Sequence, residues 1–283
     1  PISVVYSGSR FSDWRLADKG RITTGFRMNG INPYLQDERS ILQHLHKNTN
    51  LINNAEKIKR IYFFGAGSSS KERKDKIKNV LERFFVNARV RVDHDVIASA
   101  ISTFGDERGI IGIIGSGSNA AYYTGKKIID NNYGLGYILA DEGATNWNSQ
   151  QLLKHYMTES LPIDLRDKLE RQFNIDKKMI LERVYFAPQP TNFLNSFTDF
   201  VLDNKYHLFI NQLVKNGLRT FIKTYIKPLM KEYPDSDVNF TGSVAFNYEN
   251  LLREVATEEF NISIGTVVKE PIHNLIKYYI NKN

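Results

Sequence analysis

The sequence predicts an α/β protein built from two related halves. Short apolar strands alternate with helices along the first part of the chain, which is typical of the α/β class. A strand, a glycine turn and a second strand occur in succession twice, around Ser7-Gly8-Ser9 and again around residues 115–119. This recurrence suggests that two related halves face one ligand.

The first half of the chain shows strand patterns at its N-terminus and then an alternation of strands and helices. Alternating apolar residues predict the strands, and apolar residues at helical spacing predict the helices, one of which Ser70 can cap. The predicted strands are 2–6, 14–17, 22–28, 61–64 and 90–92, and the predicted helices are 41–52, 71–85 and 96–104.

The second half opens with an apolar strand at 110–114 and a hairpin of 119–123 with 126–130, turning at Thr124-Gly125. The chain then becomes largely helical, and we expect Pro228 to kink or end the longest helix. Pro271 starts the last helix. The other predicted helices are 148–158, 164–173, 176–186, 196–204, 207–232 and 245–258, with strand segments at 238–240, 262–264 and 267–268.

The composition of the chain excludes several kinds of site and partner. The chain has 283 residues, 41% hydrophobic and 24% charged, and no cysteine, which excludes disulfides and thiolate metal sites. No apolar stretch is long enough to span a bilayer, and the N-terminus lacks a secretory signal pattern, so we expect a cytoplasmic protein without a membrane partner. The net charge of +7 comes from basic residues mixed with acidic ones, as in 71–76, and we expect no nucleic-acid partner.

The stretch 110–143 is the strongest candidate for a ligand site. A buried strand leads into the small polar turn at 115–119, and Gly134, Gly136, Asp141 and Glu142 follow. Glycine lets backbone N–H groups approach an anion, which points to a phosphate and metal site. Two ordinary hairpins that need positive φ angles explain the same glycines equally well.

Several motifs together resemble one known family. They are Ser7-Gly8-Ser9 with Asp13-Trp14, Gly30-Ile31-Asn32-Pro33, Tyr62-Phe63-Phe64-Gly65-Ala66-Gly67, Gly115-Ser116-Gly117-Ser118-Asn119, Gly134-Leu135-Gly136-Tyr137-Ile138-Leu139, Asp141-Glu142-Gly143 and Thr241-Gly242-Ser243-Val244-Ala245. In this order and spacing, over nearly the whole chain, they resemble the N-acetylglucosamine kinase-like branch of the BadF/BadG/BcrA/BcrD-type ATPases, in the sugar kinase, heat-shock protein and actin superfamily.

The resemblance implies two ribonuclease-H-like (actin-like ATPase) domains around a central cleft. The expected N-terminal domain is 1–109, joined by the C-terminal helix 270–283, and the expected C-terminal domain is 110–269. The implied reaction is ATP-dependent phosphorylation of N-acetylglucosamine or a related amino sugar, with ATP and Mg²⁺ as cofactors. A homodimer is a possible assembly.

The resemblance also implies roles for individual residues, and no side chain is assigned as a metal ligand. Asp95 matches the catalytic base, although an aspartate before a helix is by itself more simply an N-cap. Asn32 and Asp141 can likewise serve as turn or cap residues. The implied sugar-binding residues are Asn32, Ser118, Asn119, Gly134, Leu135, Gly136 and Asp141, and the implied ATP-binding residues are Gly8, Ser9, Arg10, Gly115, Ser116, Gly117, Thr241, Gly242 and Ser243.

The first phosphate motif departs from the family pattern. Tyr6 stands where relatives carry the acid that holds Mg²⁺ through water, and Arg10 and Phe11 replace a threonine and a lysine. Asp13 could reach toward the metal or face solvent. We therefore keep two hypotheses, an active sugar kinase and a non-catalytic sugar- or nucleotide-binding homologue with reduced or lost turnover.

Two further classes are not expected. An ATPase that activates a reductase partner would need cysteines for an iron–sulfur cluster, and the chain has none. The six histidines form no metal-binding motif, so histidine-based metal catalysis is not expected either. His94 stands out because it adjoins Asp95 and could tune it. The loop that carries Asp141 and Glu142, here called the acidic loop, also departs from the family pattern. Ala140 and Thr145 add side chains there, where the backbone needs room.

Overall fold

The structure is a computed structural model that describes residues 1–8, 11–34, 36–129 and 133–282. Two five-stranded sheets with flanking helices form the chain, which confirms the α/β class. The contacts divide the chain into two compact units. The first unit comprises 1–107, 123–128 and 270–283, and the second comprises 108–122 and 129–269. None of the helices in the described part of the chain is long and apolar enough to cross a membrane.

The sheet of the first unit has the strand order β3-β2-β1-β4-β5. Strand β1 lies antiparallel to β2 and parallel to β4, so the sheet is mixed. The three N-terminal strands are longer than predicted from the apolar alternation. The strands are β1 (Ile2–Ser7), β2 (Phe11–Asp18), β3 (Arg21–Asn29), β4 (Arg60–Gly65) and β5 (Arg89–His94).

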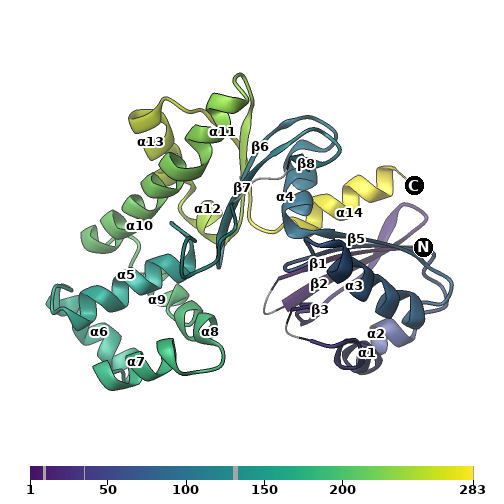
Figure 1. Ribbon diagram of the computed structural model, residues 1–283, viewed down its shortest axis with the longest axis horizontal. Helices are drawn as coiled ribbons and strands as arrows, with labels where there is room; N and C mark the ends of the chain where they lie inside the picture. Colours follow the sequence, from purple (N-terminus) through teal and green to yellow (C-terminus); the bar gives the residue numbers. More distant parts are fainter. Residues whose placement is uncertain (9–10, 35, 130–132, 283) are drawn as a thin grey trace. The chain divides into compact units, whose positions relative to one another are not determined.

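Different helices cover the two faces of this sheet (Figure 1). Val5, Trp14 and Phe63 pack with the apolar residues of α1 (Glu38–His46), α2 (Thr49–Ile52) and α3 (Lys71–Phe84). Helices α4 (Asp95–Phe104) and α14 (Ile272–Asn281) contact the sheet through β1 and its neighbours. The single helix predicted at 41–52 is two helices, because Asn48 caps a new one through Leu51 N–H.

The sheet of the second unit has the order β10-β9-β6-β7-β8. When the strands of each sheet are numbered in chain order, the first sheet reads third, second, first, fourth, fifth from its β3 edge. The second sheet gives the same order when it is read from its β8 edge, so both units repeat one strand order. This shared topology explains why the strand–glycine turn–strand pattern occurs twice in the sequence. The strands are β6 (Gly109–Ile114), β7 (Ser118–Tyr123), β8 (Ile128–Ile129), β9 (Val238–Thr241) and β10 (Ile264–Val268).

Helices supply most of the core of the second unit, around buried side chains such as Phe200, Leu218 and Phe240. The helix predicted at 196–204 is shorter than expected, and a separate helix precedes it. The helices are α5 (Thr145–Met157), α6 (Ile163–Phe173), α7 (Lys177–Tyr185), α8 (Pro190–Asn195), α9 (Thr198–Asp203), α10 (Leu208–Phe221), α11 (Lys227–Glu232), α12 (Ser243–Asn247) and α13 (Glu249–Phe260).

The long helix predicted at 207–232 contains a π-helical segment, η1 (Ile222–Ile226), between α10 and α11. Lys227 N–H donates to Ile222 O, five residues back. Pro228 lacks an N–H, and its ring crowds the carbonyl four residues earlier in a regular α-helix. The wider π turn directly before Pro228 relieves that crowding, so the helix continues instead of ending there.

Candidate functional site

In the first unit, the end of β1 is tied to the turn that carries Asn32. The Ser7 hydroxyl donates to Ile31 O (3.0 Å) and accepts from Ile31 N–H (2.9 Å). Gly8 N–H donates to Phe11 O (2.9 Å) and closes the predicted phosphate hairpin at its base. Two of the ATP-binding residues predicted there, Ser9 and Arg10, lie outside the described residues.

Asn32 organises its own turn. Its Oδ1 accepts from Tyr34 N–H (2.9 Å), and its N–H donates to Gln36 Oε1 (2.9 Å). This is the turn role that the sequence allowed. The glycine loop after β4 lies against the same side chain, since Gly67 has φ +78° and a Cβ there would be 2.8 Å from Asn32 Oδ1. Asn32 is therefore held rigidly beside a loop that only glycine permits.

Asp95 is the first residue of α4, and His94 occupies the N-cap position without a side-chain cap hydrogen bond. The N-cap role that the sequence alone favoured for Asp95 is therefore wrong. Burial raises the pKa of the Asp95 carboxyl above its usual range, while the His94 charge and the Val96 N–H act in the opposite direction. A carboxyl with a raised pKa at the start of a helix is suited to accept a proton.

Tyr6 faces Asp95 from β1. Burial and the Asp95 charge raise the pKa of the Tyr6 phenol, while a hydrogen bond with the Ser99 side chain acts against them. Tyr6 therefore presents a neutral hydroxyl. In the β1–β2 ladder, Tyr6 lies directly opposite Asp13.

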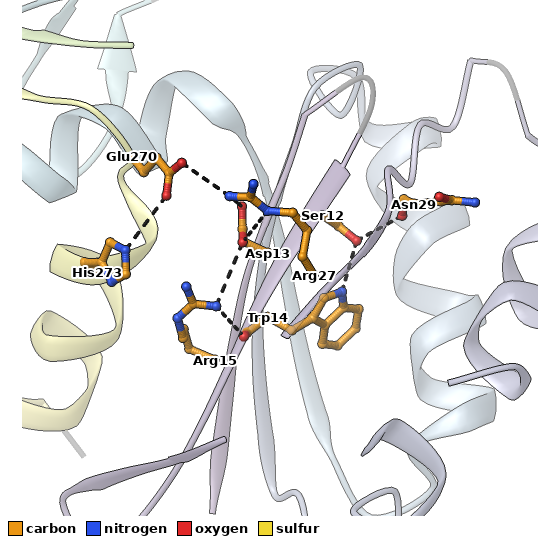
Figure 2. Close-up of polar contacts among 8 residues, drawn as sticks. All are labelled: Ser12, Asp13, Trp14, Arg15, Arg27, Asn29, Glu270 and His273. Carbon is orange, nitrogen blue, oxygen red and sulfur yellow. Dashed lines mark hydrogen bonds and ion pairs between the residues drawn. The ribbon is translucent and has the colours of Figure 1, made fainter. Parts of the chain in front are cut away.

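Asp13 neither faces solvent nor remains free for a metal ion. Its carboxylate accepts two hydrogen bonds from Arg27, from Nε to Oδ1 and from Nη2 to Oδ2, each 3.0 Å, and Arg15 lies 3.9 Å away (Figure 2). Arg27 also contacts Glu270 (3.2 Å), which His273 approaches at 3.8 Å. Only 9% of Asp13 is exposed.

Tyr6 and Asp13 do not fit the role of direct carboxylate ligands for Mg²⁺. The phenol is neutral, and Arg27 already occupies both oxygens of Asp13. Among the residues that the structure describes, no three His, Asp or Glu side chains gather into a metal-binding group.

In the second unit, Asp141 closes the glycine turn between β6 and β7. Asp141 has φ +65°, and its Oδ1 accepts from Ser118 N–H (2.8 Å). Its Oδ2 accepts from Asn146 Nδ2 (3.3 Å). A Cβ on Gly117 would lie 2.9 Å from the same carboxylate, so glycine is needed there. Burial raises the pKa of Asp141, although these hydrogen bonds act in the opposite direction.

The start of α5 packs onto the same turn. Thr145 N–H donates to Gly115 O (2.9 Å), and Asn146 N–H donates to Ser116 O (3.1 Å). The turn carbonyls thus satisfy two of the N–H groups that a helix N-terminus leaves unpaired. Ala140 and Thr145, which depart from the family pattern, are both buried and are accommodated in this packing.

The remaining predicted residues of the second unit surround the turn. A Cβ on Gly134 would lie 2.9 Å from Asn119 Nδ2, and one on Gly242 would lie 2.3 Å from Ile114 O. Leu135 is 55% exposed, and no atom lies within 4 Å of a Cβ built on Gly136. Thr241 ends β9, and Ser243 begins α12. Within this unit, the loops predicted for phosphate and for sugar are in contact.

Two groups near Asp141 were not predicted from the sequence, the Asn146 side chain and the Tyr225 hydroxyl. The Ser118 hydroxyl and Asn146 Oδ1 are buried, and neither has a hydrogen-bond partner in the described part of the chain. Tyr225, in the π-helical segment, donates from its hydroxyl to Glu142 Oε2. The aspartate-to-asparagine spacing of five residues was visible in the sequence. The Tyr225 contact spans 83 residues and left no local signal.

Comparison with solved structures gives full-length matches. A candidate N-acetylglucosamine kinase from Porphyromonas gingivalis is 30% identical, covers 99% of both chains and has a TM-score of 0.92. One from Chromobacterium violaceum is 15% identical over 99% of this chain and 98% of its own, with a TM-score of 0.68. A ROK family glucokinase from Streptomyces griseus, in complex with glucose and AMPPNP, is 13% identical over 98% and 97%, with a TM-score of 0.57.

The last two structures support the fold alone because their identities are low. No protein-family model and no curated protein matches the chain. Because the Porphyromonas gingivalis structure is 30% identical over nearly the full length of both chains, the chain belongs to the bacterial N-acetylglucosamine kinase-like family of actin-like sugar kinases.

Proposed function

We propose that this chain is an ATP-dependent sugar kinase that phosphorylates N-acetylglucosamine or a related amino sugar. The observation that carries the proposal is Asp95, a half-buried residue at the first position of α4 whose carboxyl has its pKa raised by burial. A phosphoryl transfer to a sugar needs a base that accepts the proton of the attacking hydroxyl. Asp95 takes that role.

The reaction then follows from the chemistry of phosphoryl transfer. The sugar hydroxyl gives its proton to an Asp95 oxygen while its own oxygen attacks the γ-phosphorus of ATP. The bond to the β–γ bridging oxygen breaks, and ADP leaves. The backbone N–H groups of the turn at Gly115, Ser116 and Gly117, and those near Gly8, are the groups we assign to the phosphates.

Sugar recognition is assigned to the loops around Asp141. The buried Ser118 hydroxyl and Asn146 Oδ1 have no partner among the described residues, and a native protein rarely leaves such groups unpaired. A sugar hydroxyl or amide can supply the missing hydrogen bonds. We assign Asn32, Asn119, Gly134, Leu135 and Gly136 to the same substrate.

The test is an assay of ATP-dependent phosphorylation over a panel of sugars that includes N-acetylglucosamine, glucosamine and glucose. We expect turnover with an amino sugar and its loss in Asp95→Asn. Asp75→Asn, which removes an exposed carboxylate from α3, is the matched control and should leave turnover unchanged. Full turnover by Asp95→Asn would reject Asp95 as the base.

A second candidate function is a sugar- or nucleotide-binding homologue without turnover. The neutral Tyr6 phenol and the engagement of Asp13 by Arg27 favour it, because both remove carboxylates from the first phosphate motif. Thermal shifts with ATP–Mg²⁺ and with sugar, measured separately, distinguish the two functions, since a ligand stabilises only the state that binds it. A response to sugar without a response to nucleotide supports the second function.

A further inference from the structure

A pocket outside the candidate site lies in the first unit. Its volume is about 660 Å³, which is within the usual range for small-molecule sites. Five segments meet there: strands β4 and β5, the end of α4, the turn between β7 and β8, and helix α14. None of the residues assigned above to ATP or to sugar lines this pocket.

The turn at Gly125 packs closely against the end of α4 at this pocket. Gly125 has φ +88°, and a Cβ there would lie 2.3 Å from Asp106 O, so only glycine allows the approach. The Tyr123 hydroxyl donates to Gly105 O (3.1 Å) from the same hairpin. These contacts hold Lys126, the next residue, at the rim of the pocket.

The rim carries a surplus of positive charge. Arg91, Lys126 and Lys282 face a single acid, Asp106. Asp106 accepts from Lys282 Nζ (2.6 Å), and this bond raises the pKa of Lys282 to about 12, so the ammonium stays charged at neutral pH. Arg91 is paired with Asp93 (3.0 Å), whereas Lys126 has no ion pair within the described ranges. Lys126 is thus the cation that an anionic ligand could engage without breaking an existing pair.

Aromatic rings complete the pocket. Tyr62 and Tyr279 stack with their centroids 3.8 Å apart and their planes 18° from parallel. Tyr62 is only half-buried, which leaves part of its ring at the pocket. Aromatic side chains offer a flat surface to a ring of a ligand, while lysine and arginine hold a phosphate as charge and hydrogen-bond donors.

We propose that this pocket binds a phosphate monoester carried on a sugar or nucleoside ring. The cations at the rim take the phosphate dianion, and the tyrosine surface takes the ring. This site is separate from the proposed kinase reaction and does not depend on it. Free phosphate could bind the same cations, so the test compares the binding of inorganic phosphate with the binding of phosphates carried on a ring.

The experiment is calorimetric titration of the full chain with inorganic phosphate, glucosamine 6-phosphate and AMP. Lys126→Glu is compared with Lys127→Glu, which makes the same change in net charge at the adjacent exposed lysine outside the pocket. We expect Lys126→Glu to weaken binding of a ring phosphate about tenfold or more, equivalent to about 1.4 kcal/mol. Lys127→Glu should change it less than twofold.

A second variant tests whether the loss in Lys126→Glu comes from the lost charge and not from a distortion of the turn. Arg91→Gln, on a different strand, should weaken the same ligand in the same direction. Equal binding of inorganic phosphate and both ring phosphates would overturn the ring assignment. The absence of binding by all three ligands, or equal losses in Lys126→Glu and Lys127→Glu, would overturn the site.

Discussion

At the residue scale, Asp95 is the proposed base, and its charged form lowers the stability of the fold. Burial raises its pKa, so the folded state favours the protonated carboxyl. Its contribution to stability is therefore greatest below the unfolded pKa of about 3.9 and decreases as the pH rises through the folded pKa. At neutral pH the charge destabilises the fold, so we expect Asp95→Asn to raise the Tm while lowering kcat by about 10²- to 10⁴-fold.

Calorimetry of wild type and Asp95→Asn at pH 7 and at pH 4 tests the predicted rise in Tm. The difference in Tm between the two proteins should be smaller at pH 4, where more of the wild-type carboxyl is protonated. The acid limb of the kcat/KM profile should lie at higher pH than an ordinary aspartate would give. A lower Tm for Asp95→Asn than for wild type at pH 7 would contradict the assignment of burial as the dominant influence.

Arg27 is the second residue whose removal has a definite expected effect. Asp13 is 9% exposed and depends on Arg27 for both of its strongest hydrogen bonds (Figure 2). Because the variant leaves a buried carboxylate short of partners, we expect Arg27→Gln to lower the free energy of unfolding by about 1–3 kcal/mol. Urea denaturation measures the loss.

Two further variants isolate the Asp13–Arg27 pair. The double variant Asp13→Asn with Arg27→Gln should recover part of the loss, because no unpaired charge then remains. Arg21→Gln, at an exposed position of β3, should stay within about 0.5 kcal/mol of wild type. Additive losses in the double variant would show that the two side chains act independently.

At the scale of elements, the π-helical segment η1 aims Tyr225 at the acidic loop. Its hydroxyl donates to Glu142, next to Asp141, and burial followed by this bond raises the pKa of Tyr225. The link braces a loop in which Asp141 adopts φ +65°. If Asp141 binds sugar, Tyr225→Phe should raise the KM for sugar several-fold and leave the KM for ATP unchanged.

Steady-state kinetics with sugar and ATP varied in turn measure the two KM values separately. Tyr185→Phe, which removes a hydroxyl from a tyrosine that is 72% exposed on α7, is the matched control. A change in both KM values would point to a general loss of structure. An unchanged KM for sugar would show that the brace does not position the sugar loop.

These elements also show what sequence periodicity can predict. Apolar alternation and short apolar runs located most of the strands, and helical spacing located α3 and α10, because each pattern follows from one local geometry. The π segment was missed because its cause is the backbone crowding at Pro228, which apolar spacing does not record. The single predicted helix over 41–52 failed for a similar reason, since the capping role of Asn48 depends on a local hydrogen bond.

At the scale of the whole molecule, the repeated strand order was predictable and the pairings across strands were not. Two glycine turns after apolar strands suggested two related halves, and both sheets share one order. The pairing of Asp13 with Arg27 depends on the register of β2 and β3. The bonds of Asp141 to Ser118 and Asn146 need both the turn and the start of α5, so composition could not reveal them.

The first unit depends on a helix from the far end of the chain. In α14, Leu275 is fully buried, and the helix packs against β1, β2 and α4. We expect Leu275→Ala to cost about 2–5 kcal/mol through lost burial and the cavity left behind. Hydrogen exchange should show the loss mainly at amides of β1 and β4, with those of β6 and β9 less affected, because the second unit has a core of its own. Lys277→Ala, exposed on the same helix, should preserve protection in both sheets. Equal loss of protection in the two sheets would show instead that the units unfold as a single cooperative body.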